Sequence, residues 1–133
     1  MRGKAFGLPA QGYKTKEKTM STMNVIRVMK QKIHPDSILF VKVGTFYNVY
    51  GRDSYIISYF FGYQIKKVET TINTCGFPKS AISKVSKKME DEKINYIVLN
   101  RSLNYEAEEE MDFKDKNRYK EIYTKAHKYL EKI

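Results

Sequence analysis

Two short apolar runs constrain the fold of this chain more than any other feature. Residues 38–43 (Ile-Leu-Phe-Val-Lys-Val) and residues 94–99 (Ile-Asn-Tyr-Ile-Val-Leu) are compact and rich in branched side chains. A run of this length and kind is typical of a β-strand that is covered on both faces. Gly44 allows a sharp turn after the first run, so that residues 46–50 form a second strand. We therefore expect a sheet with other elements packed on both of its faces.

Helical patterns alternate with these strands. Apolar residues recur at three- and four-residue steps over 19–33 until Pro35 ends the helix, and again over 82–89 after Pro78 and Ser80. Residues 51–54 supply helix-start chemistry, and 55–61 are apolar nearly all round, so this helix must be largely buried. Residues 64–71 have strand propensity, and a turn is expected at 73–76. The order predicts an α/β fold, a mixed β-sheet flanked by helices.

The two ends of the chain differ from its middle. Residues 1–16 mix glycines with lysines and show no apolar period, which indicates a flexible basic arm before a domain spanning 17–104. Residues 105–133 are expected to form an acidic linker and then an extra C-terminal amphipathic helix at 116–133. Its apolar stripe either folds back on the sheet or packs against a protein partner; we favour the first. The stripe comprises Tyr119, Ile122, Tyr123, Ala126, Tyr129, Leu130 and Ile133.

Composition narrows the class of protein. At 133 residues and 41% hydrophobic content, one domain with tails is expected. No apolar run approaches the roughly 20 residues of a membrane span, and the start lacks a signal-peptide core, so a soluble, cytoplasmic protein is expected. Cys75 is the single cysteine and the histidines are His34 and His127, which argues against a zinc site or another metal site built on nitrogen and sulfur. No cofactor is expected.

The formal net charge of +10 favours a polyanionic partner such as nucleic acid. The excess of Lys and Arg lies within residues 1–104, because residues 105–133 carry nearly equal numbers of basic and acidic side chains. A Lys-rich composition that merely solvates the surface would give the same charge. Charge alone therefore does not decide the function.

From residue 19 to about residue 100, the chain resembles the N-terminal mismatch-recognition domain of the MutS DNA repair family, known as domain I. The order of elements matches, and several short motifs fall where the family pattern places them. These are His34-Pro35-Asp36, Leu39-Phe40, Gly44, Phe46-Tyr47 and Cys75-Gly76-Phe77-Pro78 with Ala81. The resemblance implies a noncatalytic reader of the DNA minor groove. In the family, the phenylalanine of a Phe-Tyr-Glu triplet stacks on an unpaired base, the glutamate hydrogen-bonds to it, and the DNA is kinked.

Phe46 matches the stacking position, but the chain departs from the family pattern elsewhere. Asn48 stands in place of the glutamate, so a neutral amide that donates and accepts replaces an acid that only accepts when ionised. Ser80 stands in place of a common histidine. We expect a stand-alone domain, without the connector, lever, clamp and ATPase domains of MutS, whose recognition of mismatched or distorted duplex DNA is looser than in the family.

Three functions follow from these observations. The first is a stand-alone DNA-binding module that uses an aromatic wedge, with contacts from Phe46, Asn48, Tyr47, Lys42, Lys66, Lys67 and Lys79. The second is a protein-interaction adaptor that docks a nucleic-acid enzyme through the 116–133 helix. The third, a metal-dependent nuclease, needs converging carboxylates, whereas Asp36, Asp53 and Glu69 are isolated in the sequence. We therefore expect no catalytic residues.

Overall fold

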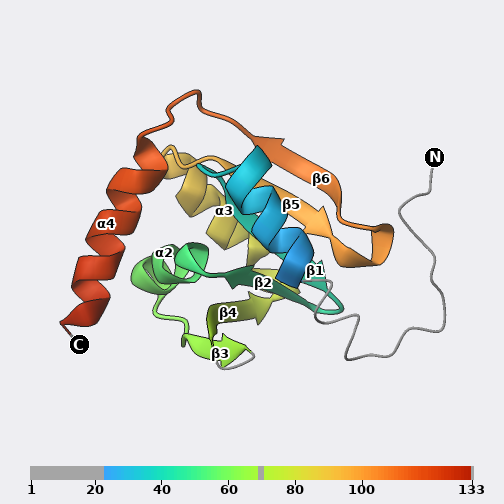
Figure 1. Cartoon of the computed structure of the whole chain (residues 1–133), viewed down its shortest axis with the longest axis horizontal. Coiled ribbons are helices and arrows are strands. Elements are labelled where there is room, and N and C mark those ends of the chain that lie inside the picture. Colours follow the sequence, from blue (N-terminus) through green and yellow to red (C-terminus); the bar gives the residue numbers. More distant parts are fainter. Residues whose placement is uncertain (1–22, 69–70, 133) are drawn as a thin grey trace.

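A six-stranded mixed sheet forms the centre of the protein (Figure 1). The structure is a computed structural model and describes residues 23–68 and 71–132. The strands lie in the order β3-β4-β2-β1-β5-β6, and only β1 and β5 are parallel neighbours. Their bounds are β1 Ile38–Val43, β2 Phe46–Tyr50, β3 Lys66–Val68, β4 Ile72–Pro78, β5 Tyr96–Asn100 and β6 Glu106–Met111.

Helices cover both faces of the sheet. The N-terminal helix is α-helical over residues 23–28 and continues as a π-helical turn, η1, over Met29–Ile33. The other helices are α2 Arg52–Phe61, α3 Ile82–Asp91 and α4 Arg118–Glu131, with short 3-10 turns η2 Lys79–Ala81 and η3 Arg101–Leu103. The expected α/β fold with an extra C-terminal helix is confirmed.

Strand alternation sends successive side chains to opposite faces. Ile38 and Phe40 of β1 enter a large core beneath α2, α3 and α4, whereas Leu39 and Val41 enter a smaller core beneath the N-terminal helix, where they meet Ile26. All four strand residues are buried, as expected for a strand covered on both faces. We call the side with Leu39 and Val41 the N-helix face.

The C-terminal helix folds back onto the body. Tyr119, Ile122 and Ala126 of α4 are buried in the large core, and α4 packs alongside α2 (Figure 1). The ring of Tyr123 lies 6.0 Å from that of Tyr55 on α2. The preferred expectation for this stripe is thus confirmed for its buried members, which are not available to a partner.

A buried polar cluster ties the helices to the sheet. Asp53 of α2 is 1% exposed; its carboxylate accepts the Leu39 backbone N–H at 3.0 Å and the Lys30 ammonium at 2.8 Å. Lys30 also donates to the Ser37 carbonyl, and the Tyr119 hydroxyl donates to Asp53. Burial, together with the charge and hydrogen bond of Asp53, raises the pKa of Tyr119 well above its usual range. We call Lys30, Asp53 and Tyr119 the buried triad.

Two segments differ from the sequence expectation. Residues 105–133 do not begin with a linker, because Glu106–Met111 form β6, which pairs with β5 at the sheet edge. An edge strand leaves its outward carboxylates in water, so a run of glutamates can still form a strand. The turn expected at 73–76 lies instead inside β4, which pairs with β2 and β3. The arm expected over residues 1–16 lies outside the described residues.

Candidate nucleic-acid interface

A tight hairpin between β1 and β2 presents Phe46. Gly44 has a φ of +62°, a conformation that favours glycine, and the Lys79 backbone N–H donates to the Thr45 carbonyl at 2.8 Å. Phe46 begins β2, paired with Val43 on one side and Pro78 on the other. Its side chain is 47% exposed on the N-helix face. A large apolar ring therefore stands in solvent on a hairpin whose backbone is held from both sides.

Tyr47 points the other way. It is 6% exposed, lies in the large core, and stacks on Phe77 with ring centroids 5.8 Å apart and an interplanar angle of 25°. Burial raises the pKa of its hydroxyl, with a smaller effect from Glu108 and Glu109. Tyr47 thus supports the hairpin from inside and is not on the surface that carries Phe46, contrary to its inclusion among the contact residues.

Asn48 lies next to Phe46 on the same face, since strand residues two apart share a face. Burial raises the pKa of the Tyr50 hydroxyl, and the nearby Asn48 amide partly opposes that rise. Opposite Asn48 in the register is Gly76 of β4, where an added Cβ would clash with the Asn48 Oδ1 atom. Gly76 therefore leaves the space that the Asn48 amide occupies.

The four candidate lysines lie in three places. Lys79 follows Pro78, the pairing partner of Phe46, and is exposed beside the hairpin. Lys42 pairs with Tyr47, so strand alternation places it on the opposite face from Phe46. Lys66 and Lys67 are exposed on β3 at the sheet edge. Only Lys79 is therefore adjacent to Phe46, and none of the four forms an ion pair within residues 23–68 and 71–132.

Charge is graded across the sheet. The β3 edge carries Lys66 and Lys67, whereas β6 at the far edge carries Glu106, Glu108, Glu109 and Glu110. A phosphate backbone is attracted to the first edge and repelled by the second. The half of the N-helix face formed by β3, β4 and β2, which includes Phe46 and Asn48, is the half that favours a polyanion.

Sequence reasoning did not find the part that three residues play at this surface. Tyr50 follows Asn48 on the same face of β2, and Gly76, already part of the recognised motif, leaves the space for the Asn48 amide. Arg101 follows β5, and its charge acts on Tyr50 across the sheet. Each assignment depends on which strands are neighbours and in which register. The alternation of Cys75 and Phe77, both buried, is the one sequence signal that would have indicated β4.

Comparison with known families matches this geometry to one of them. The family model described as MutS domain I matches residues 20–122, which is well over half of the chain. The chain belongs to the MutS domain I family. The match runs beyond the resemblance seen in the sequence, because it includes β6 and the first turn of α4. No curated protein matches the chain.

Membership of the MutS domain I family indicates what kind of domain this is. Domain I of MutS is a noncatalytic DNA-recognition domain. No helix in the described part of the chain is long and apolar enough to cross a membrane. Over the same residues, no group of three or more His, Cys, Asp and Glu side chains is placed to hold a metal ion. Asp53, one of the carboxylates considered for a nuclease, is held inside the buried triad.

Proposed function

We propose that this domain is a noncatalytic DNA-binding module that enters mismatched or otherwise distorted duplex DNA with the ring of Phe46. The observation that carries the proposal is the exposure of Phe46, 47%, at the start of a strand whose next apolar residues, Tyr47 and Val49, are buried. A flat apolar ring can replace a stacking partner of a base, and wedge insertion needs a few kcal/mol of unstacking that a mismatch reduces in advance.

Asn48 and the lysines supply the polar part of the interface. The Asn48 amide lies on the Phe46 side and both donates and accepts, so it suits either kind of hydrogen-bonding group on a base edge. Lys79, beside the hairpin, and the β3 lysines give the phosphates a basic surface. Phosphate contacts set overall affinity and its salt dependence, whereas the ring sets the preference for a weakened step.

The adaptor function has less support. Its premise was an apolar stripe on α4 that needed a partner, but Tyr119, Ile122 and Ala126 are buried against the body. Tyr129 is exposed, yet its ring lies 5.5 Å from that of Tyr59. The cytoplasmic location and the absence of a cofactor stay predictions.

Binding of matched, mismatched and bulged duplexes by wild type and Phe46→Ala tests the wedge. Base–aromatic stacking is worth about 1–3 kcal/mol, so Phe46→Ala should weaken binding to mismatched or bulged DNA by about 5- to 150-fold. Binding to matched DNA, which depends on phosphate contacts, should change by less than about threefold. Fluorescence anisotropy at fixed salt measures both.

Ile33→Ala is the matched control. Ile33 is 58% exposed and ends η1, just before β1 begins, so it lies at the other end of β1 from the hairpin. This variant should bind every duplex as wild type does. Equal binding of all duplexes by wild type and Phe46→Ala would show that the ring does not enter DNA.

A further inference from the structure

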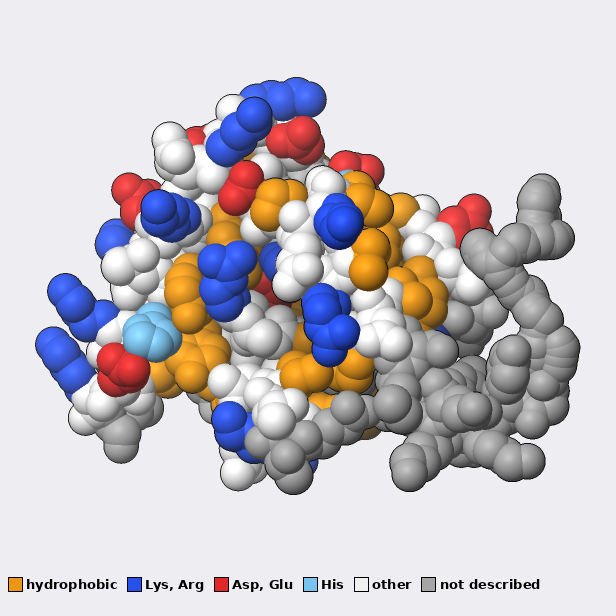
Figure 2. Space-filling view, in the orientation of Figure 1, with side chains coloured by type: hydrophobic (Ala, Val, Ile, Leu, Met, Phe, Trp, Pro, Cys, Tyr) orange, Lys and Arg blue, Asp and Glu red, His pale blue; other side chains and the backbone are white. Residues whose placement is uncertain are grey.

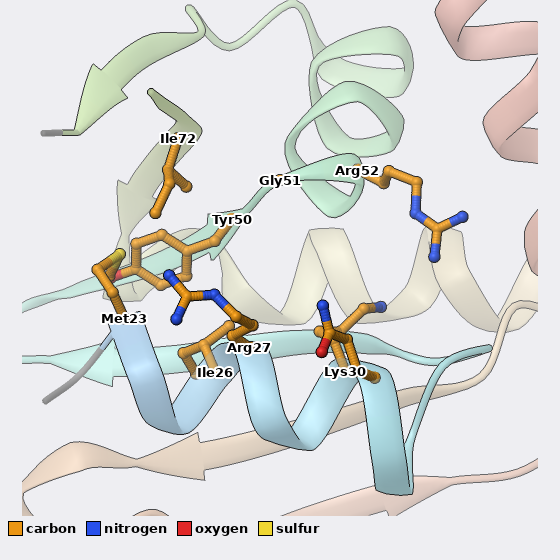
Figure 3. A pocket seen from close by; sticks show the side chains of 9 residues that line it. Met23, Ile26, Arg27, Lys30, Tyr50, Gly51, Arg52 and Ile72 are labelled. Carbon is orange, nitrogen blue, oxygen red and sulfur yellow. The ribbon is translucent and has the colours of Figure 1, made fainter. Parts of the chain in front are cut away.

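The N-terminal helix lies on the same face of the sheet as Phe46, and a pocket of about 250 Å³ lies between this helix and strands β2 and β4. The apolar side chains that line the pocket are Met23, Ile26, Tyr50 and Ile72. Figure 3 shows the Tyr50 ring between the helix and Ile72, and Arg27 reaching from the helix toward that ring. Arg27 therefore brings a positive charge of the N-terminal helix to the side of the sheet that carries the wedge.

The other basic side chains that line the pocket in the described part of the chain are held by partners elsewhere. Lys30 forms an ion pair with the buried carboxylate of Asp53 at 2.8 Å. The Arg52 guanidinium lies over the Tyr123 ring of α4, 5.5 Å from its centroid, and turns away from the pocket (Figure 3). Arg27 is therefore the cation of the described lining that is placed to meet a ligand.

Arg27 is exposed, yet its guanidinium is oriented by the helix. Its Nη1 atom donates to the side-chain oxygen of Asn24 at 3.0 Å, about one turn earlier in the helix. No ion pair joins Arg27 to a carboxylate within residues 23–68 and 71–132. A guanidinium has five N–H donors in a planar fork, so the hydrogen bond to Asn24 uses only one of them. Such a fork binds a phosphate with two parallel hydrogen bonds.

The surroundings of Arg27 also favour an anion. No Asp or Glu is among the described residues that line the pocket. Gln31, about one helical turn after Arg27, lines it as well and adds amide N–H donors. Figure 2 shows Lys and Arg side chains standing over apolar surface in the middle of this face. An anion that approaches Arg27 therefore meets hydrogen-bond donors and no carboxylate of the described lining.

The distance between Arg27 and the wedge matches the dimensions of a duplex. Phe46, Asn48 and Tyr50 are alternate residues of β2, so their side chains leave the same face of the strand. Four residues of extended strand place Tyr50, toward which Arg27 reaches, roughly 13 Å from Phe46. Across a minor groove about 6 Å wide, this distance passes the groove wall, and along the duplex it is about four base pairs. In either direction, a group at this distance meets the phosphate backbone.

We propose that Arg27 binds a phosphate of the DNA backbone within about four nucleotides of the base step that Phe46 enters, and so anchors the N-terminal helix on the duplex. The proposal rests on the proposed function, because it takes the DNA to lie on the N-helix face. The contact requires no base to leave the stack. Phosphate contacts carry no sequence information, so Arg27 sets position and affinity, whereas Phe46 sets the preference for a mismatch.

A methylphosphonate scan tests this contact. Each duplex carries one mismatch and one methylphosphonate, a neutral replacement for a phosphate, at a single position within about six nucleotides of the mismatch on either strand. Neutralising the phosphate that Arg27 binds should weaken binding by wild type about tenfold, as expected for a charge-assisted hydrogen bond. Arg27→Gln should bind the unmodified duplex about tenfold more weakly and should lose nothing further at that position.

Salt dependence provides a second measurement. Because one phosphate contact is lost, Arg27→Gln should reduce the slope of log K against log salt concentration by about 0.9. Its loss of affinity should be the same factor for matched and mismatched duplexes. Arg27→Lys, which keeps the charge without the fork, should keep the slope of wild type. Lys32→Gln is the matched control, since it removes the same charge from an exposed residue of the same helix that does not line the pocket; it should keep the wild-type methylphosphonate profile.

The possible results separate this contact from the wedge. If every methylphosphonate weakens wild type and Arg27→Gln by the same factor, Arg27 binds no phosphate and the proposal is overturned, while the Phe46→Ala comparison still tests the wedge. A loss in Arg27→Gln that is confined to mismatched duplex would also overturn it, because Arg27 would then read the mismatch. If Phe46→Ala binds every duplex as wild type does, the proposed function fails, whereas a methylphosphonate effect that depends on Arg27 would still support the phosphate contact.

Discussion

Replacing Lys30 with methionine should destabilise the protein more than any other change of one exposed or half-buried lysine. The substitution keeps most of the length of the side chain but removes the ammonium, which donates to Asp53 at 2.8 Å and to the Ser37 carbonyl at 2.5 Å. Asp53 is 1% exposed and would retain only the Leu39 N–H and the Tyr119 O–H as donors. A carboxylate left buried without its cation costs about 3–5 kcal/mol. For a chain of this size, that lowers the Tm by about 10–20 °C.

Urea unfolding followed by circular dichroism measures this loss, and a double variant tests its cause. Adding Asp53→Asn to Lys30→Met removes the uncompensated charge yet keeps an oxygen that can accept the Leu39 N–H. The double variant should therefore be more stable than Lys30→Met alone. Lys32→Met, at an exposed position of the same helix, should change the free energy of unfolding by less than about 0.5 kcal/mol. A cost below about 1 kcal/mol for Lys30→Met, or a double variant less stable than the single one, would refute the charge pairing.

Three further predictions concern the interface, the core and α4. Gly76→Ala should keep the fold, because the atom that an added Cβ meets most closely is the tip of the Asn48 side chain. It should change the affinity for mismatched DNA by the same factor as Asn48→Ala, since both displace the Asn48 amide. A double variant that binds more weakly than either single variant would contradict this reasoning. Burial raises the pKa of Cys75 to about 12 and that of Tyr119 further, so the unfolded chain loses these protons first as pH rises. The urea midpoint should therefore fall above about pH 9, and less steeply in Tyr119→Phe; a flat profile to pH 11 would contradict it. Truncation after Asn117 removes α4 and should abolish cooperative thermal unfolding, whereas an intact transition would show that α4 is dispensable.

Local pattern was sufficient for the elements with strong periodicity. The run at 38–43 and the glycine turn predicted β1 and β2 with the same residues that the structure shows. These strands were predictable because apolar continuity, branched side chains and a glycine all favour the same local conformation. The helix over 82–89 was equally clear, since its apolar stripe faces the core and its charges face water.

The missed strands had local sequences that favour other structures. β4 contains Asn73, Thr74 and Gly76, which favour a turn, yet pairing with β2 and β3 on either side holds this segment extended. β6 is a run of glutamates, and only its position at the sheet edge makes this composition compatible with a strand. In both cases pairing between segments distant in sequence outweighs local propensity.

At the interface, too, local sequence predicted some features and strand pairing decided others. Phe46 and Tyr47 are adjacent in the sequence, so the alternation of side chains along a strand predicts only that their rings lie on opposite faces. The packing of Tyr47 on Phe77 decides that Tyr47 is buried and Phe46 is exposed. Lys42 is near Phe46 in the sequence, but the period of two along β1 places it on the other face.

The sequence by itself determined the fold class, the family and the identity of the candidate wedge, because these depend on motifs and periodicity within short segments. Only the tertiary structure decided which side of the hairpin faces solvent, that Gly76 makes room for Asn48, and that the N-terminal helix, β2 and β4 line a common pocket. The physical reason is register: side chains from β2, β4 and the N-terminal helix become neighbours only when the sheet brings their backbones together, and no local pattern encodes that pairing.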